Sequence, residues 1–325
     1  MKKYFRILIF IIGLVGILVM VEKYLIPMDI GKTAIKSAIT SKDQVYIVGS
    51  SHVYWAYNPF EIEKVAKLPT SLASSSSQTF EQSYFIIKKL LRNTNTKVIF
   101  LETYLINDKE NKDIKEDSCN LAFDYLSTLD RIEISKYYLG KIDYQYVFNF
   151  YKYHSNWKNS EVIKENLRNS KKFSEVKFTR DYHPLKGFVP HNNRTPDTEG
   201  RGYKKIPENY FNNNLKVDKE RKINENSEKL LLNLFEESNK NKIKLILITS
   251  PFYYQHENAE KTCEYSNYLS KLAKNNGSEL INFNYLYEEL QLERSYFKDS
   301  GHLNKYGAKI LGNYLGNYLN SIVGK

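Results

Sequence analysis

The sequence predicts an α/β protein in which helices cover both faces of a parallel β-sheet. Four short apolar runs predict the strands, at residues 44–49, 97–102, 243–250 and 278–283. Most of these runs are continuous rather than alternating, which is typical of strands buried on both faces. Amphipathic helix patterns lie between the runs. Because strands and helices alternate along the chain, a three-layer α/β/α fold is expected.

The first segment of the chain has the length and composition of a transmembrane helix. Lys2, Lys3 and Arg6 precede an uncharged, mostly apolar stretch from Ile7 to Val21. With its flanks this stretch offers about 20 residues, near the length that crosses a bilayer. No small residues suited to signal peptidase follow it, which favours an uncleaved anchor over a secretory signal. The basic start predicts a cytoplasmic N-terminus and a single-pass protein with its body outside the cell membrane.

Helix signals lie between the predicted strands. Asn58 followed by Pro59 predicts the start of a short helix. Thr79 and Gln82 form a capping box ahead of an amphipathic pattern. Two longer amphipathic patterns predict helices at residues 227–240 and 304–322.

The chain divides into an anchor at residues 1–26, a linker at 27–43 and one extracytoplasmic domain at 44–325. Residues 106–222 are rich in Tyr, Lys and Asn and lack the strand–helix rhythm. We interpret them as a large insertion, with a helical cap over the sheet edge and a loop-rich second half. The remaining length is enough for one full hydrophobic core.

Composition narrows the classes of partner and cofactor. The net charge of +11 suits an anionic partner, but it also fits a chain rich in Lys, Asn, Ile and Tyr. No basic block interleaved with aromatic residues is present, so we expect no nucleic-acid binding. The six histidines and two cysteines show no metal-ligand spacing, and we expect no metal and no cofactor. The sequence leaves open whether Cys119 and Cys263 pair.

Two polar clusters carry the chemical signal. Ser50 and Ser51 follow the first strand, and Asp299 and His302 precede the last helix. Loops at the carboxyl ends of parallel strands meet at one edge of a sheet, so these side chains can meet there. Histidine can take the proton of a serine hydroxyl near neutral pH, and a carboxylate orients the imidazole. The combination indicates acyl-transfer chemistry.

The clusters "GSSH" at residues 49–52 and "DSGHLN" at residues 299–304 together resemble the motifs of the SGNH (GDSL-like) hydrolase superfamily. The resemblance covers about residues 44–102 and 243–322. It implies a flavodoxin-like sheet, with Ser51 as nucleophile, His302 as base and Asp299 as the orienting carboxylate.

The oxyanion blocks of that family are less well matched. The second block reads "LASSSSQT" at residues 72–79 and has no glycine, and the third offers only an asparagine several residues beyond the strand. A backbone amide of the serine loop can still serve as donor. The candidate oxyanion donors are Ser51, Ser76, Ser77 and Asn107.

The anchor and the insertion make the chain most similar to the membrane-anchored branch of the superfamily, which includes proteins of teichoic acid D-alanylation and polysaccharide O-acetylation. This likeness implies serine-dependent acyl transfer or ester hydrolysis on a cell-envelope glycan or teichoic acid. The partners would be the lipid bilayer and a multi-pass membrane acyltransferase. The alternative is a catalytically weak or inactive protein that binds glycan or acts as a scaffold for that acyltransferase.

Overall fold

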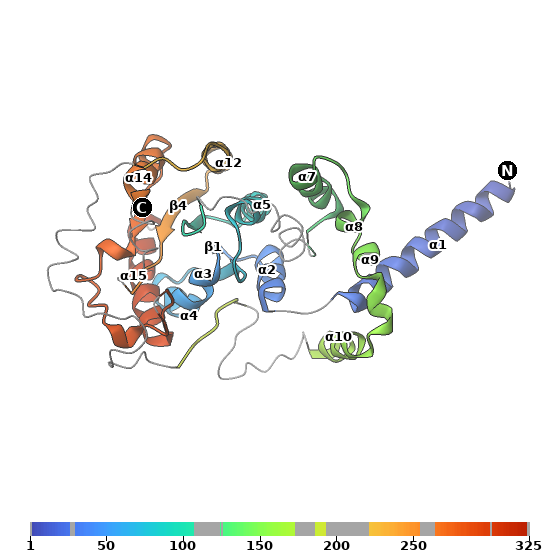
Figure 1. Ribbon diagram of the computed structural model, residues 1–325, viewed down its shortest axis with the longest axis horizontal. Helices are drawn as coiled ribbons and strands as arrows, with labels where there is room; N and C mark the ends of the chain where they lie inside the picture. The colour runs from blue at the N-terminus through green and yellow to red at the C-terminus, as the bar shows by residue number, and fades with distance from the viewer. Residues whose placement is uncertain are drawn as a thin grey trace. The chain divides into compact units, whose positions relative to one another are not determined.

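The computed structural model describes residues 2–26, 30–106, 124, 126–172, 186–192, 221–253, 264–299 and 301–323. The chain forms two units, and Figure 1 labels some of their helices and strands. One unit comprises residues 1–32 and 111–177, and the other comprises residues 33–110 and 178–325. The second unit contains the sheet and the two polar clusters that the sequence singles out.

Five parallel strands form the sheet, in the spatial order β2-β1-β3-β4-β5. They are β1 (Val45–Gly49), β2 (Thr70–Ser74), β3 (Val98–Glu102), β4 (Lys244–Thr249) and β5 (Leu280–Asn282). The predicted α/β class with a parallel sheet is confirmed. In sheets of this order the strand order reverses between β1 and β3, and ligands bind beyond the carboxyl ends of the strands at that point.

Strand β2 departs from the expected polar loop at residues 72–79. All five of its residues are buried, although Thr70, Ser71 and Ser74 carry hydroxyl groups. Because small hydroxyl side chains make no apolar pattern, periodicity cannot reveal such a strand. The outer edge of β2 is covered, since the N–H of Leu72 donates to the carbonyl oxygen of Lys186 at 3.0 Å. Covering an edge in this way prevents pairing with another chain.

Buried side chains line both faces of the sheet, as in a three-layer fold. On one face, Ile47, Phe100 and Ile248 belong to a hydrophobic core. Helices from early and late parts of the sequence share this core. These helices are α3 (Ser51–Ala56), α4 (Pro59–Ala66) and α15 (Lys305–Val323). Three further helices contact β1, β4 and β5, respectively: α5 (Phe80–Leu90), α12 (Glu225–Lys240) and α14 (Ser266–Asn275).

The helix ends predicted from the sequence are found. The side chain of Asn58 accepts from the N–H of Phe60 at 3.0 Å, and Pro59 is the first residue of α4. Thr79 and Gln82 make both hydrogen bonds of the capping box that begins α5. The helices expected at residues 227–240 and 304–322 are α12 and α15, each within two residues of the predicted limits.

Close packing of α4 on α15 depends on glycine. A Cβ atom at Gly316 would lie 2.6 Å from the Cβ of Val65, and one at Gly312 would lie 3.0 Å from the carbonyl oxygen of Asn58. Both distances are shorter than normal contacts, so side chains at these positions would push the helices apart. Glycine therefore lets α15 pack directly against α4.

Residues 30–40 form helix α2 (Ile30–Thr40) inside the segment expected to be a linker. Ala34, Ile35 and Ala38 are buried, and they recur at the spacing of one helix face. The stretch is short and its apolar positions alternate with Lys, Thr and Ser, which weakens the pattern in the sequence. An ordered, packed helix thus replaces part of the expected linker.

The other unit combines the N-terminal helix α1 (Lys2–Leu25) with helices of the insertion. These are α7 (Thr128–Leu139), α8 (Tyr144–Val147), α9 (Asn149–Lys152), the 3-10 helix η1 (His154–Lys158) and α10 (Ser160–Lys172). Asn156 and Asn166 donate, each at 2.9 Å, to the carbonyl oxygens of Leu25 and Tyr24, which satisfies the last turn of α1. The described first half of the insertion is helical, as expected. Its placement over the sheet edge stays a prediction.

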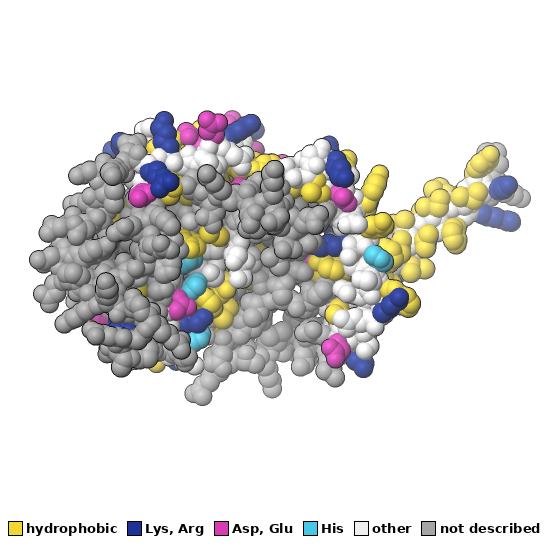
Figure 2. Space-filling view, viewed as in Figure 1, with side chains coloured by type: hydrophobic (Ala, Val, Ile, Leu, Met, Phe, Trp, Pro, Cys, Tyr) yellow, Lys and Arg dark blue, Asp and Glu magenta, His cyan; other side chains and the backbone are white. Residues whose placement is uncertain are grey.

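Helix α1 is 24 residues long. Hydrophobic side chains cover it in Figure 2, with basic side chains near the N-terminus. Its large apolar side chains are exposed from Tyr4 to Ile17. Within the described residues, no helix combines the length and apolar content that crossing a membrane requires, so the expected transmembrane helix is not found there.

Candidate active site

The candidate nucleophile lies at the turn from β1 into α3. Ser50 is the N-cap of α3, and its side chain accepts from the N–H of His52 at 3.4 Å. Ser51 is the first residue of the helix and is partly exposed. A Cβ atom at Gly49 would lie 2.6 Å from the Cβ of Glu102 and 2.9 Å from a methyl group of Val53. Only glycine therefore fits at the end of the strand.

The segment before α15 presents the other two residues of the predicted triad. Phe297 and Leu303 form an antiparallel bridge, and the N–H of Lys298 donates to the carbonyl oxygen of His302 at 2.9 Å. Asn304 then caps α15, because its side chain accepts from the N–H groups of Tyr306 and Gly307. These contacts fix the backbone on both sides of His302.

The structure brings Ser51, His302 and Asp299 into one hydrogen-bonded chain. The Oγ atom of Ser51 lies 3.0 Å from Nε2 of His302. On the other side of the ring, Nδ1 of His302 lies 2.8 Å from Oδ1 of Asp299. When Nδ1 carries the proton and donates to the carboxylate, Nε2 is left to accept from the serine hydroxyl. This is the arrangement in which histidine can act as the base.

Asp299 is held in its ionised form. Burial raises the pKa of its carboxyl group, whereas the hydrogen bond and charge of His302 lower it. The N–H of Gly301 also donates to Oδ1 at 3.0 Å, and Lys298 adds a nearby positive charge. The net result is a pKa below the ordinary value. The carboxylate can therefore stabilise an imidazolium beside it.

Aromatic rings surround the imidazole of His302. His52 stacks on it at 4.7 Å between ring centroids, and Trp55 meets it edge-on at 4.2 Å. Lys298 lies over the ring of Trp55, with Nζ 3.4 Å from the centroid. Figure 2 shows histidine side chains close to acidic and basic ones on the face in view. These contacts restrict the orientation of His302, and they assign His52 a packing role.

Among the described residues, the candidate oxyanion donors are not brought together as the triad residues are. Ser76 and Ser77 are exposed in the loop after β2, and Ser77 has a left-handed backbone with φ of +50°. Ser51 stands at the start of α3, where its N–H points out of the first turn. Asn107 lies outside the described residues. Of the two loop serines, Ser76 is linked to the candidate nucleophile, because the hydroxyl group of Tyr54 interacts with both Ser76 and Ser51.

Sequence reasoning missed Tyr54, which lies one helical turn after Ser51 in α3. Its hydroxyl group interacts with the hydroxyls of both Ser51 and Ser76. Burial raises the pKa of Tyr54, although the two serines act in the opposite direction. The signal that the sequence offered was the spacing of Tyr54 from Ser51, because residues three apart share one face of a helix.

Glu102, the last residue of β3, is the second residue that sequence reasoning missed. Its side chain is 5% exposed, and its Oε1 accepts from the N–H of Tyr104 at 3.0 Å. The N–H of Ser250 and the hydroxyl of Ser50 also interact with the carboxyl group. Burial raises the pKa of Glu102 to about 8 in spite of these hydrogen bonds. One acidic side chain thus links the segments that follow β1, β3 and β4.

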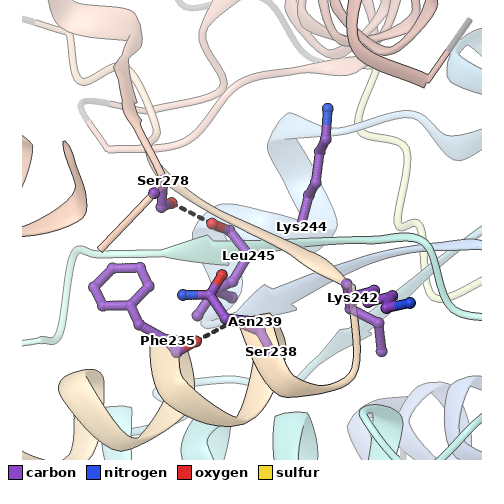
Figure 3. Close-up of a pocket in the computed structure, with 9 residues that line it drawn as sticks. Phe235, Ser238, Asn239, Lys242, Lys244, Leu245 and Ser278 are labelled. Atoms are coloured by element: carbon purple, nitrogen blue, oxygen red, sulfur yellow. Dashed lines mark hydrogen bonds between the residues drawn. The ribbon is translucent and has the colours of Figure 1, made fainter. Parts of the chain in front are cut away.

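A cavity of about 200 Å³ lies at the opposite end of the sheet, where α12 leads into β4 (Figure 3). Its lining includes Phe235, Ser238, Leu245 and Ser278, and no residue of the triad. Ser238 donates to the carbonyl oxygen of Phe235 and Ser278 to that of Leu245, so these hydroxyls already have partners. The cavity is therefore separate from the triad.

The geometry of the triad is suited to nucleophilic attack by Ser51 on a carbonyl carbon. Among the residues that the structure describes, no three His, Cys, Asp or Glu side chains group closely enough to hold a metal ion. Comparison of the sequence with family models and with curated proteins finds no match.

Proposed function

We propose that this protein is a serine-dependent acyltransferase or esterase of the SGNH type. The observation that carries the proposal is the unbroken path from Ser51 through His302 to Asp299, with distances of 3.0 Å and 2.8 Å. The parallel sheet with the order 2-1-3-4-5 supports it, because the path lies beyond the carboxyl ends of the strands. The two motifs that resemble the superfamily supply these three residues in the expected order.

In the proposed reaction, the Oγ atom of Ser51 bonds to the carbonyl carbon of an acyl ester. The serine proton moves to Nε2 of His302, and the π electrons of the carbonyl move onto its oxygen. Collapse of this intermediate breaks the bond to the leaving oxygen, which takes the proton from His302. An acceptor hydroxyl or water then repeats the sequence on the acyl-serine and regenerates Ser51.

The substrate class rests on the resemblance and on the N-terminal segment. We propose that the acyl acceptor or ester is a hydroxyl-bearing polymer of the cell envelope, a glycan or a teichoic acid. The apolar, exposed side chains of α1 and its basic start favour attachment to a membrane, with the sheet unit outside the cell. A multi-pass membrane acyltransferase is the proposed source of the acyl group.

Covalent labelling with a fluorophosphonate tests the enzymatic part of the proposal. The full-length protein in detergent should label and should hydrolyse a small activated acetate. Ser51→Ala should abolish both, because the attacking oxygen is removed. Ser321→Ala, which changes an exposed serine on α15, should leave both unchanged. A wild-type protein that is folded but neither labels nor hydrolyses would leave the binding or scaffold alternative.

The cellular part of the proposal needs a separate experiment. Envelope polymers from cells with and without the protein should differ in their ester-linked acyl groups, and Ser51→Ala should behave like the deletion. The protein should sediment with membranes and should be released when residues 1–26 are removed. Equal acyl content in all strains would exclude the proposed substrate class.

A further inference from the structure

The proposed reaction needs a hydrogen-bond donor for the charge that develops on the carbonyl oxygen. Preorganised donors of this kind are usually among the largest contributors to acyl-transfer catalysis. The loop after β2 lacks the glycine expected there, and the side chains of Ser76 and Ser77 are exposed. A further donor close to Ser51 would complete the proposed site.

Tyr54 is placed for this role by helix α3. It follows Ser51 by three residues, so both side chains project from the same face of the helix. Its ring packs against the hydrophobic core and meets the ring of Trp55 edge-on at 4.9 Å. The N–H of Val189 donates to its carbonyl oxygen at 2.9 Å. Backbone and ring are thus held while the hydroxyl faces Ser51 and Ser76.

The phenol of Tyr54 is in the protonation state that a donor requires. Partial burial disfavours the phenolate and raises the pKa above its ordinary value of 10.0, against the opposing effect of Ser76 and Ser51. The group therefore stays neutral at physiological pH and keeps its O–H. Hydrogen bonds to a reacting group often shorten only in the transition state, so contact in the resting site need not be tight.

We propose that the Tyr54 hydroxyl donates a hydrogen bond to the oxyanion formed when Ser51 attacks the acyl ester. The inference rests on the proposed function. The Tyr54 proton stays on the phenol throughout, and the transferred proton still moves from Ser51 to His302. Ser76 interacts with the same phenol. Tyr54 thereby takes over a task that the expected glycine does not perform here.

Tyr54→Phe tests the proposal by removing one oxygen and keeping the ring. The kcat for a small activated acetate should fall about 100-fold to 1,000-fold with little change in KM, as for loss of one oxyanion donor. A trifluoromethyl ketone, which forms a tetrahedral oxyanion adduct on serine, should lose affinity by a similar factor. Tyr46→Phe is the matched control, because its hydroxyl contacts Ser41 and Asn93 away from the site. That variant should keep the wild-type kcat.

A fluorinated tyrosine at position 54 gives a readout that a purely structural role would not produce. Its more acidic phenol should ionise within the working range, so the alkaline limb of kcat against pH should move to lower pH. Unchanged kcat and inhibitor affinity in Tyr54→Phe, or an unmoved limb in the fluorinated protein, would overturn the inference. Because wild-type activity is measured in parallel, an inactive wild-type protein identifies failure of the proposed function instead.

Discussion

The end of β3 and the segment before α15 each place an acidic side chain at the carboxyl end of the sheet. The two regions shift the pKa of that side chain in opposite directions. Glu102 is buried and has a pKa raised to about 8, whereas Asp299 is partly exposed and has a lowered pKa. The difference lies in their partners. Asp299 faces the imidazole of His302 and the charge of Lys298, while Glu102 meets only neutral donors. Burial dominates where no opposite charge compensates it.

The comparison assigns the two carboxyl groups to different tasks. Asp299 keeps a negative charge that can stabilise a protonated His302. Glu102 is mostly protonated at neutral pH and connects three rim segments as a neutral hydrogen-bonding group. Changing each charge should therefore affect catalysis in one case and stability in the other.

The largest effect should come from Asp299→Asn. An amide at this position favours the wrong imidazole tautomer and cannot stabilise the cation, so kcat should fall by up to about four orders of magnitude. The melting temperature should change little. Asp143→Asn, at the N-cap of α8, is the matched control and should keep full activity. An unchanged rate in Asp299→Asn would remove the carboxylate from the proposed mechanism.

The next effect should appear in the pH dependence of stability and concerns Glu102. Its folded-state pKa of about 8 lies above its ordinary value of 4.5. Its contribution to stability is therefore complete below about pH 4.5 and is lost as the pH rises through 8. Within this window the free energy of unfolding should fall by about 1.4 kcal/mol per pH unit from this group.

Glu102→Gln should remove that slope, since an amide does not titrate. Urea unfolding of the two proteins across the window measures it. Glu236→Gln, an exposed position on α12, should retain the wild-type slope. Parallel pH profiles for wild type and Glu102→Gln would show that Glu102 ionises normally, and the contrast with Asp299 would then disappear.

The smallest effect should come from Ser50→Ala, which changes both the helix start at Ser51 and the surroundings of Glu102. Loss of the N-cap should lower the free energy of unfolding by about 1 kcal/mol. Fluorophosphonate labelling should persist in part, because Ser51 remains. Loss of the Ser50 hydroxyl also removes one hydrogen bond that lowers the pKa of Glu102, so the stability slope should extend to higher pH. Complete loss of labelling in this variant, with retained labelling in Ser51→Ala, would exchange the roles of the two serines.

Much of the fold follows from local patterns in the sequence. The apolar runs predicted β1, β3, β4 and β5, and capping residues such as Asn58 and Thr79 predicted helix starts. Strand β2 was not predictable, because its buried hydroxyl side chains mimic a loop. Its burial depends on neighbours that come from elsewhere in the chain.

The candidate site likewise has residues that the sequence could predict and residues that it could not. The meeting of Ser51, His302 and Asp299 was predictable because their motifs stand next to recognisable elements. The importance of Glu102 depends on contacts with segments after β1 and β4, which no local pattern encodes. Tyr54 carries a faint signal in its spacing from Ser51, but its contact with Ser76 arises only in the folded chain.

The glycine-dependent packing of α15 on α4 has a consequence for how the protein is made. Synthesis from the N-terminus delivers Ser51 early, whereas His302 follows 251 positions later. The proposed nucleophile lacks its proposed base until α15 has emerged and packed with Gly312 and Gly316 against α4. A growing chain would therefore carry Ser51 without its proposed base until α15 packs against α4.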